Sequence, residues 1–144
     1  MEIPNYELNE WLEVLELDQR ERVQQLVEKY GAEEAIDKWI LGNSQTKGIK
    51  AGGDGIKNFI EKYKNEINKF ICGHPDYDDF RKKFEGIFDE INKETKAVIV
   101  SGLSAIIGSQ LNITEAILAP IIVLSLYLAG TMGVKAYCSG ITFE

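Results

Sequence analysis

The single histidine of the chain, His74, is the most obvious candidate for chemistry. It lies in the stretch Cys72-Gly-His-Pro-Asp-Tyr-Asp-Asp79, where Asp76 could orient its ring as the carboxylate behind a general base. A zinc site needs several ligands at a recognised spacing, and one histidine two residues after one cysteine does not supply them. Because Pro75 and Asp76 are also residues expected between two helices, we interpret His74 as a turn residue.

The tripeptide His74-Pro75-Asp76, placed between two helices, resembles the loop tripeptide of J-domain co-chaperones. That family uses it, with a basic preceding helix, to stimulate a chaperone partner. The resemblance here covers only the tripeptide and its helix–loop–helix setting. The first helix of that family cannot be matched to residues 30–55, so we interpret the tripeptide as a coincidence.

Two further stretches contain residues that bind ions in other proteins. The glycine-rich stretch 48–55 precedes a helix, as phosphate-binding loops do, but it lacks the GKS/T motif and Asp54 would repel a phosphate. The acidic stretch 76–79 lacks the glycine and the terminal glutamate of an EF-hand. We interpret the first stretch as an interhelical loop and the second as an acidic helix start, which the helix dipole stabilises.

Serines in the apolar part of the chain are the remaining candidate nucleophiles. Ser101, Ser104 and Ser125 lie in predicted helices, where a hydroxyl can bond to a preceding backbone carbonyl. A serine nucleophile needs an adjacent base, and the chain has one histidine. We therefore predict no catalytic, metal-binding or cofactor-binding residues, no cofactor, and a protein that is not an enzyme.

Charge is distributed very unevenly along the 144 residues. Residues 1–95 hold 14 of the 16 Lys and Arg and 21 of the 23 Asp and Glu, so they carry the whole net charge of −7. This acidity argues against a nucleic-acid binder, because neutralising phosphates needs a basic face.

The two cysteines and the N-terminal residues indicate the cellular compartment in which we expect the protein. Cys72 and Cys138 are too few for a disulfide framework, and we interpret them as two buried thiols in a reducing compartment. A single bridge between helix ends is the alternative. Residues 1–11 contain neither the basic nor the apolar region of a signal peptide, so we expect a cytoplasmic protein.

Helical spacing of apolar residues recurs through the acidic part of the chain. Three helices are predicted before residue 42, with a break at Leu17–Asp18, a glycine cap at Gly31 and a buried Trp39. Residues 43–55 are predicted as a loop, with Asp54 as the cap of the next helix. Stripes over residues 56–71 and 77–91 predict two amphipathic helices, which we expect to form an antiparallel hairpin with Asp76 as a cap.

The last third of the chain is apolar. Residues 97–108 and 116–134 predict two apolar helices, with a capping box starting at Asn112, and residues 96–138 together predict an apolar helical hairpin. The uncharged run 116–134 has 19 residues, which as a helix would span about 28 Å, close to the thickness of a bilayer core. A helix that is apolar on all sides is also typical of the centre of a bundle, and we favour that interpretation.

These patterns predict a single all-α domain over residues 1–144, a compact bundle of six or seven helices with a central apolar C-terminal helix. Acidic amphipathic helices occupy residues 1–95. For function we predict a non-catalytic protein-interaction or regulatory module within a larger assembly. It would bind a protein partner or self-associate through its acidic surface or through residues 43–55. The alternative is a protein that inserts the hairpin 97–138 into a membrane, with residues 116–134 as the membrane segment.

Overall fold

Every regular element in the described part of the chain is a helix. The computed structural model describes residues 3–43, 53–84 and 92–143. The all-α class is confirmed, and the eight α-helices of these ranges exceed the expected six or seven because three have only five residues. The elements are α1 (Leu8–Leu12), α2 (Leu17–Tyr30), α3 (Ala32–Asn43), α4 (Gly53–Ile71), the 3-10 helix η1 (Pro75–Tyr77), α5 (Asp78–Lys82), α6 (Lys93–Leu111), α7 (Glu115–Met132) and α8 (Val134–Cys138).

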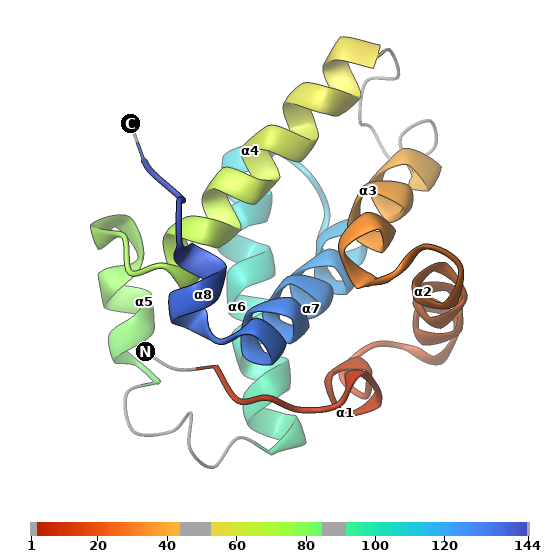
Figure 1. The fold of residues 1–144 in the computed structure, drawn as a ribbon, viewed down its shortest axis with the longest axis horizontal. Coiled ribbons are helices and arrows are strands. Elements are labelled where there is room, and N and C mark those ends of the chain that lie inside the picture. Colours follow the sequence, from red (N-terminus) through yellow and green to blue (C-terminus); the bar gives the residue numbers. More distant parts are fainter. Residues whose placement is uncertain (1–2, 44–52, 85–91, 144) are drawn as a thin grey trace.

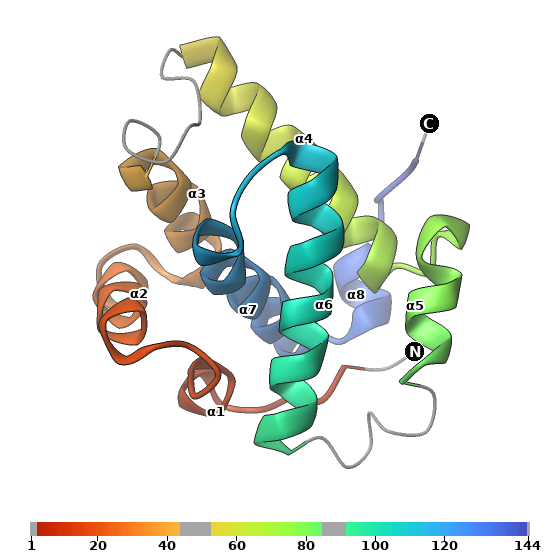
Figure 2. The ribbon, with the colours of Figure 1, turned by 180° about the vertical axis from the view of Figure 1, so that it is seen from behind.

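The apolar helix α7 lies at the centre of the molecule (Figures 1 and 2). It contacts α1, α2, α3, α4, α6 and α8. A helix that is hydrophobic on all sides is stable in water only where other elements cover its whole circumference. Most of its side chains from Ile117 to Gly130 are buried. The predicted central apolar helix is therefore confirmed.

The same helix is the one in the described residues that is long and apolar enough to cross a membrane. However, 61% of its apolar window is buried inside the protein. Gly133, with a φ of +86°, separates α7 from α8, so the run 116–134 is not one continuous helix. A core helix of a soluble protein has the same length and composition, so membrane association through residues 116–134 stays a prediction.

Proline inside α7 leaves a backbone carbonyl without its usual partner. Pro120 lacks the N–H that would bond to the carbonyl of Ala116. That carbonyl instead accepts a hydrogen bond of 3.1 Å from Nε2 of Gln19 in α2. The neighbouring carbonyl of Ile117 accepts one of 2.9 Å from Nε1 of Trp39 in α3. Polar bonds therefore anchor both α2 and α3 to the first turns of α7.

The helices α6 and α7 pack against each other as the predicted apolar hairpin, but the turn between them differs from the prediction. Asn112 does not begin α7. It ends α6 in a left-handed conformation with a φ of 57°, and the N–H of Ile113 bonds to the carbonyl of Gly108 at 3.0 Å. Thr114 is the N-cap residue of α7. The prediction was wrong because asparagine is favoured both as an N-cap and in the left-handed turn that ends a helix.

The break between the first two helices also lies earlier than predicted. It falls on residues 13–16 rather than at Leu17–Asp18. The capping box that begins α2 is formed by Glu16 and Gln19. The guanidinium of Arg20 reaches back and donates hydrogen bonds of 3.1–3.3 Å to three backbone carbonyls at the end of α1 and in the turn. These carbonyls are satisfied without a continued helix, which is why the chain can turn here.

The second predicted amphipathic helix, over residues 77–91, is different in the structure. Its described part consists of η1 and α5, and residues 85–91 lie outside the described residues. Phe80 of α5 packs on Phe70 of α4, with 5.6 Å between the ring centroids. A Cβ atom at Gly102 of α6 would lie only 2.6 Å from the Phe80 ring. Phe80 therefore packs α5 against both α4 and α6, and the predicted second long helix of the hairpin is replaced in the described residues by the short η1 and α5.

The two cysteines form a disulfide, which corrects the expectation of two buried thiols. Cys72 directly follows α4 and Cys138 is the last residue of α8, and their Cα atoms lie 5.7 Å apart, within the range that a disulfide spans. The two positions are 66 residues apart in sequence, so only the packing of α8 against α4 brings them together. Disulfides are rare in the cytosol. The cytoplasmic location therefore stays a prediction.

The N-terminal segment is fixed to the apolar hairpin at two places. A Cβ atom at Gly130 of α7 would lie 2.3 Å from the carbonyl oxygen of Pro4, so this close approach requires glycine. Lys96 of α6 is buried, and its Nζ lies 2.6 Å from a carboxylate oxygen of Glu13 and 2.6 Å from the carbonyl of Glu10. A buried ammonium is tolerated only with such partners. These contacts hold the segment around α1 against α6 and α7.

A charge at the centre of α7 should unfold the protein. Leu124 is fully buried, so Leu124→Lys should lower the free energy of unfolding by more than about 4 kcal/mol. Met132 in the same helix is 54% exposed, so the control Met132→Lys should change it by less than about 0.5 kcal/mol. Urea denaturation followed by circular dichroism measures both. Small and equal effects would show that α7 is not a core helix.

Loss of the disulfide should destabilise the folded protein because the unfolded chain gains conformational entropy. A crosslink across 66 residues removes unfolded-state entropy worth about 4 kcal/mol. Cys138→Ser should therefore lower the free energy of unfolding by about 4 kcal/mol and make it insensitive to dithiothreitol, whereas the wild type should lose a similar amount on reduction. Alkylation of both cysteines in the folded, unreduced protein, detected by mass spectrometry, would contradict the disulfide.

Candidate functional site

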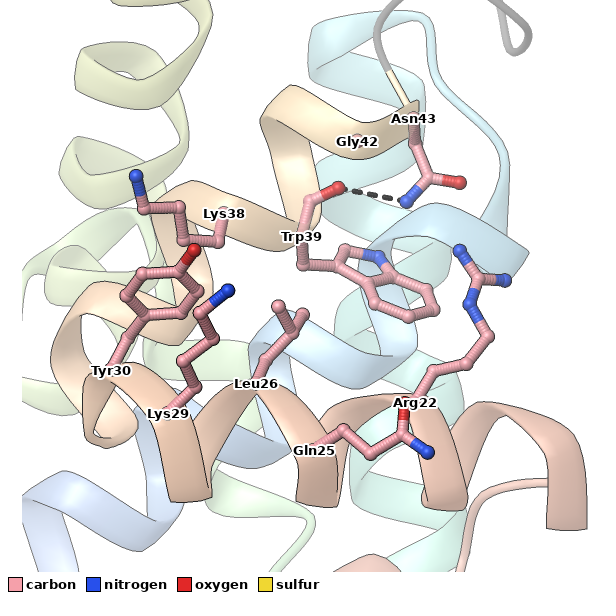
Figure 3. Close-up of a pocket in the computed structure, with 9 residues that line it drawn as sticks. All are labelled: Arg22, Gln25, Leu26, Lys29, Tyr30, Lys38, Trp39, Gly42 and Asn43. Carbon is pink, nitrogen blue, oxygen red and sulfur yellow. Dashed lines mark hydrogen bonds between the residues drawn. The ribbon is translucent and has the colours of Figure 1, made fainter.

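A groove between α2 and α3, which we call the α2–α3 groove, is the best candidate for a functional site (Figure 3). Its cavity volume is about 330 Å³. Its lining combines cationic, aromatic and amide side chains. The residues are Arg22, Gln25, Leu26, Lys29, Tyr30, Lys38, Trp39, Gly42 and Asn43.

The sharp connection between the two helices creates this groove. Only Gly31 separates α2 from α3, and its φ of +83° is a conformation that glycine adopts readily. Its N–H bonds to the carbonyl of Val27 at 2.8 Å, as the predicted glycine cap should, and its carbonyl accepts from the N–H of Ala35 at 2.9 Å. One residue therefore ends α2 and starts α3, and the two helices pack against each other.

Positive charge gathers in the groove of this acidic protein. Arg22, Lys29 and Lys38 line it, and no Asp or Glu is among its described lining residues. The guanidinium carbon of Arg22 lies 4.6 Å from the centre of the Trp39 ring. Nζ of Lys29 and Nζ of Lys38 lie 5.3 Å and 4.8 Å from the centre of the Tyr30 ring. The rings hold the cations by cation–π attraction and leave their N–H groups available to an anion.

Trp39 connects the groove to the core. Its side chain is 3% exposed, and its Nε1 donates the hydrogen bond of 2.9 Å to Ile117 of α7. The buried amide of Asn43 donates a hydrogen bond of 2.7 Å to the carbonyl of Trp39 (Figure 3). Because the bond from Nε1 is buried, the orientation of the ring beneath Arg22 is fixed by the fold. The groove therefore has a preformed aromatic wall.

The chemistry that these side chains permit is binding. Guanidinium and ammonium groups hold carboxylates and phosphates by charge-assisted hydrogen bonds. The groove has no histidine, cysteine, serine or carboxylate among its lining residues. The described lining therefore lacks a serine or cysteine nucleophile paired with a histidine or carboxylate base.

His74 is placed in the turn after α4 and remote from the lining of the groove. Its Nδ1 accepts a hydrogen bond of 3.1 Å from the N–H of Asp76, so His74, and not Asp76 as predicted, is the cap of η1. The guanidinium of Arg81 donates to the carbonyls of Phe70, at 2.8 Å, and of His74. Arg81 thereby satisfies carbonyls at the end of α4, and the imidazole of His74 stabilises the turn by capping η1.

Carboxylates near this turn are paired with neighbours and surround a second, smaller cavity of about 240 Å³. Lys69 bridges Glu66 at 3.3 Å and Asp76 at 3.2 Å, and the hydroxyl of Tyr77 donates to Glu66 at 2.8 Å. Burial, followed by the hydrogen bond to Glu66, raises the pKa of Tyr77, so its phenol stays protonated. These groups satisfy one another. No group of three or more His, Cys, Asp or Glu in the described residues has a geometry that could hold a metal ion.

The candidate serines are not brought together with a base in the described residues. Ser125 donates to the carbonyl of Ile121 at 2.8 Å, as predicted for an apolar helix, so its hydroxyl accepts the hydrogen bond of 2.7 Å from Tyr63. Burial raises the pKa of Tyr63 well above its usual value, which keeps it a donor. Ser104 is buried, and its Oγ has no hydrogen-bond partner in the described part of the chain. The prediction that the protein is not an enzyme stays a prediction.

The groove was not predicted from the sequence. Trp39 was predicted to be buried, and it is. The available signal was the pair Arg22 and Lys29, two helical turns apart on the face that also carries Leu26. Of the stretch 43–55, predicted as a loop, residues 44–52 lie outside the described residues. Gly53 begins α4, so Asp54 lies within this helix and is not its cap as predicted.

Comparisons with models of protein families, with characterised proteins and with solved structures find no significant match to this chain. The function is therefore argued from the groove itself.

Replacing the tryptophan of the groove should reveal its anchoring bond. Trp39→Phe keeps an aromatic ring but leaves the Ile117 carbonyl without this donor. Trp11→Phe is a matched control, since Trp11 is 1% exposed but its Nε1 has no hydrogen-bond partner in the described residues. We expect Trp39→Phe to lower the free energy of unfolding by about 1–3 kcal/mol more than Trp11→Phe does, as measured by urea denaturation. Equal losses would show that the bond adds nothing to stability.

Proposed function

We propose that the protein is a non-catalytic interaction module that binds an acidic segment of a protein partner in the α2–α3 groove. The main support is the gathering of Arg22, Lys29 and Lys38 around a groove without lining carboxylates, in a chain of net charge −7. Opposite charges across an interface speed association and reject unsuitable partners. The groove is thus the place in the described structure where an acidic ligand is favoured.

The surroundings of the groove favour a short segment over an extended polyanion. The same two helices carry exposed carboxylates outside the groove, at Glu21, Glu28 and Glu34. A nucleic acid presents phosphates along its whole length, and these exposed carboxylates of α2 and α3 would repel them. A cavity of about 330 Å³ accommodates a few side chains. An acidic peptide segment can place a few carboxylates in the groove without bringing further negative charge to these glutamates.

Fixed aromatic walls reduce the cost of binding. The indole of Trp39 is held by the buried hydrogen bond from its Nε1 to Ile117, so its ring does not have to be ordered when a ligand arrives. Preorganisation of this kind increases affinity because less conformational entropy is lost on association. The groove therefore combines charge complementarity with a rigid wall, as expected of a recognition site.

Charge reversal in the groove should abolish binding of an acidic probe. The probe is a fluorescein-labelled peptide of glutamate and leucine residues, and its affinity is measured by fluorescence anisotropy at about 0.15 M ionic strength, where the Debye length is about 8 Å. The double variant Arg22→Glu/Lys38→Glu should weaken binding by at least about tenfold. The control Lys57→Glu/Lys62→Glu makes the same change in net charge at exposed positions of α4, and should weaken binding less than about twofold.

Two results would overturn the proposal. If both double variants weaken binding equally, the attraction follows net charge and not the groove. If the wild type binds no acidic probe, and the amide resonances of residues 22–43 do not move in a titration followed by nuclear magnetic resonance, the groove is not an interaction site. Sedimentation equilibrium of the protein alone shows whether a second copy, rather than another protein, occupies the groove.

A further inference from the structure

The groove presents its side chains in a fixed order along α2. Arg22, Leu26 and Lys29 occupy positions i, i+4 and i+7, so they share one face of the helix. With a rise of 1.5 Å per residue, Arg22 and Lys29 lie about 10.5 Å apart along the helix axis. Leu26 lies between them (Figure 3). A ligand lying along α2 therefore meets a positive group, an apolar group and a second positive group in turn.

The two ends of the groove differ in charge. At one end Arg22 stacks on Trp39, and the free edge of its planar guanidinium can hold one carboxylate through two hydrogen bonds. At the other end Lys29 and Lys38 approach the ring of Tyr30 from two different helices. Figure 3 shows Lys38 above the Tyr30 ring and Lys29 beside it. That end carries twice the positive charge, on longer and more flexible stems.

We infer that the occupant is an amphipathic α-helix of the partner, with acidic residues at positions i and i+7 and an apolar residue at i+3 or i+4. This inference rests on the proposed function and defines the pattern that the groove recognises. A helix lying along α2 has the same rise per residue, so its carboxylates fall about 10.5 Å apart and flank the apolar side chain. The acidic residues then face Arg22 and the lysine pair, and the apolar residue packs on Leu26.

An extended segment fits this spacing poorly. In a strand, side chains on one face recur every two residues, at about 6.7 Å and then about 13.4 Å. Neither distance matches the separation of about 10.5 Å between the backbone positions of Arg22 and Lys29 along α2. An extended peptide would therefore engage one end of the groove with good geometry and miss the other. The helical repeat satisfies both ends and the apolar contact together.

Three labelled peptides of equal composition and net charge test the pattern. All have an alanine- and glutamine-rich host sequence, two glutamates and one leucine. The first has the glutamates at i and i+7 with leucine at i+4. The second has them at i and i+5, which places them on different faces of the helix. The first two peptides carry a proline at one end. The third keeps the first spacing but exchanges this proline with a central alanine, so that the proline breaks the helix. Anisotropy gives the affinities, and circular dichroism gives the helix content.

We expect the first peptide to bind at least about tenfold more tightly than the other two. A charge exchange then tests the register. The variant Lys29→Glu/Lys38→Glu should no longer bind the first peptide, and it should bind more tightly to a version whose second glutamate is replaced by lysine. The control Lys57→Glu/Lys62→Glu should show neither change. Equal affinities for all three peptides, with groove variants still weakening them, would overturn the helical pattern but leave the proposed function standing. If no peptide binds and no groove variant has an effect, the proposed function fails with it.

Discussion

The burial of α7 is the constraint on which the rest of the structure depends. Its side chains are apolar on nearly every side, so water must be excluded around the whole helix and not from one face. Six other helices contact it to achieve this. The amphipathic ones turn an apolar stripe inward, which leaves their charged residues outside. The uncharged centre and the acidic exterior therefore follow from the same packing.

The polar groups that this packing must satisfy connect the core with the groove. Pro120 leaves the carbonyl of Ala116 without its helical partner, and Gln19 supplies a donor from α2. One residue further on, Trp39 bonds to Ile117 from α3. The outer surface of this same α2–α3 pair forms the groove. A ligand would thus bind to side chains whose positions are set by the central helix, which gives a rigid site without any extra element.

Most long periodic segments were predicted well, but the stripe over residues 77–91 and several helix ends were not. The stripe over residues 56–71 became α4, and the apolar run became α7 with a short α8, because many residues agree on one helical period. Capping was assigned to Asp76 and Asn112, but His74 caps η1 and Asn112 ends α6. Several residue types fit each cap, and the preference among them is worth about 1 kcal/mol. A tertiary contact such as that of Arg81 with the carbonyls at the end of α4 is enough to decide it.

The sequence by itself determined the class of the fold and the helix that lies at its centre, because apolar periodicity and the absence of charge are local properties of the chain. It also determined the acidic surface. Only the tertiary structure decided that Cys72 meets Cys138, that Lys96 pairs with Glu13, and that Arg22, Lys29 and Lys38 face one groove. Each of these depends on how two distant or differently oriented helices pack on α7. That packing is settled by the fit of many side chains together, and no short segment encodes it.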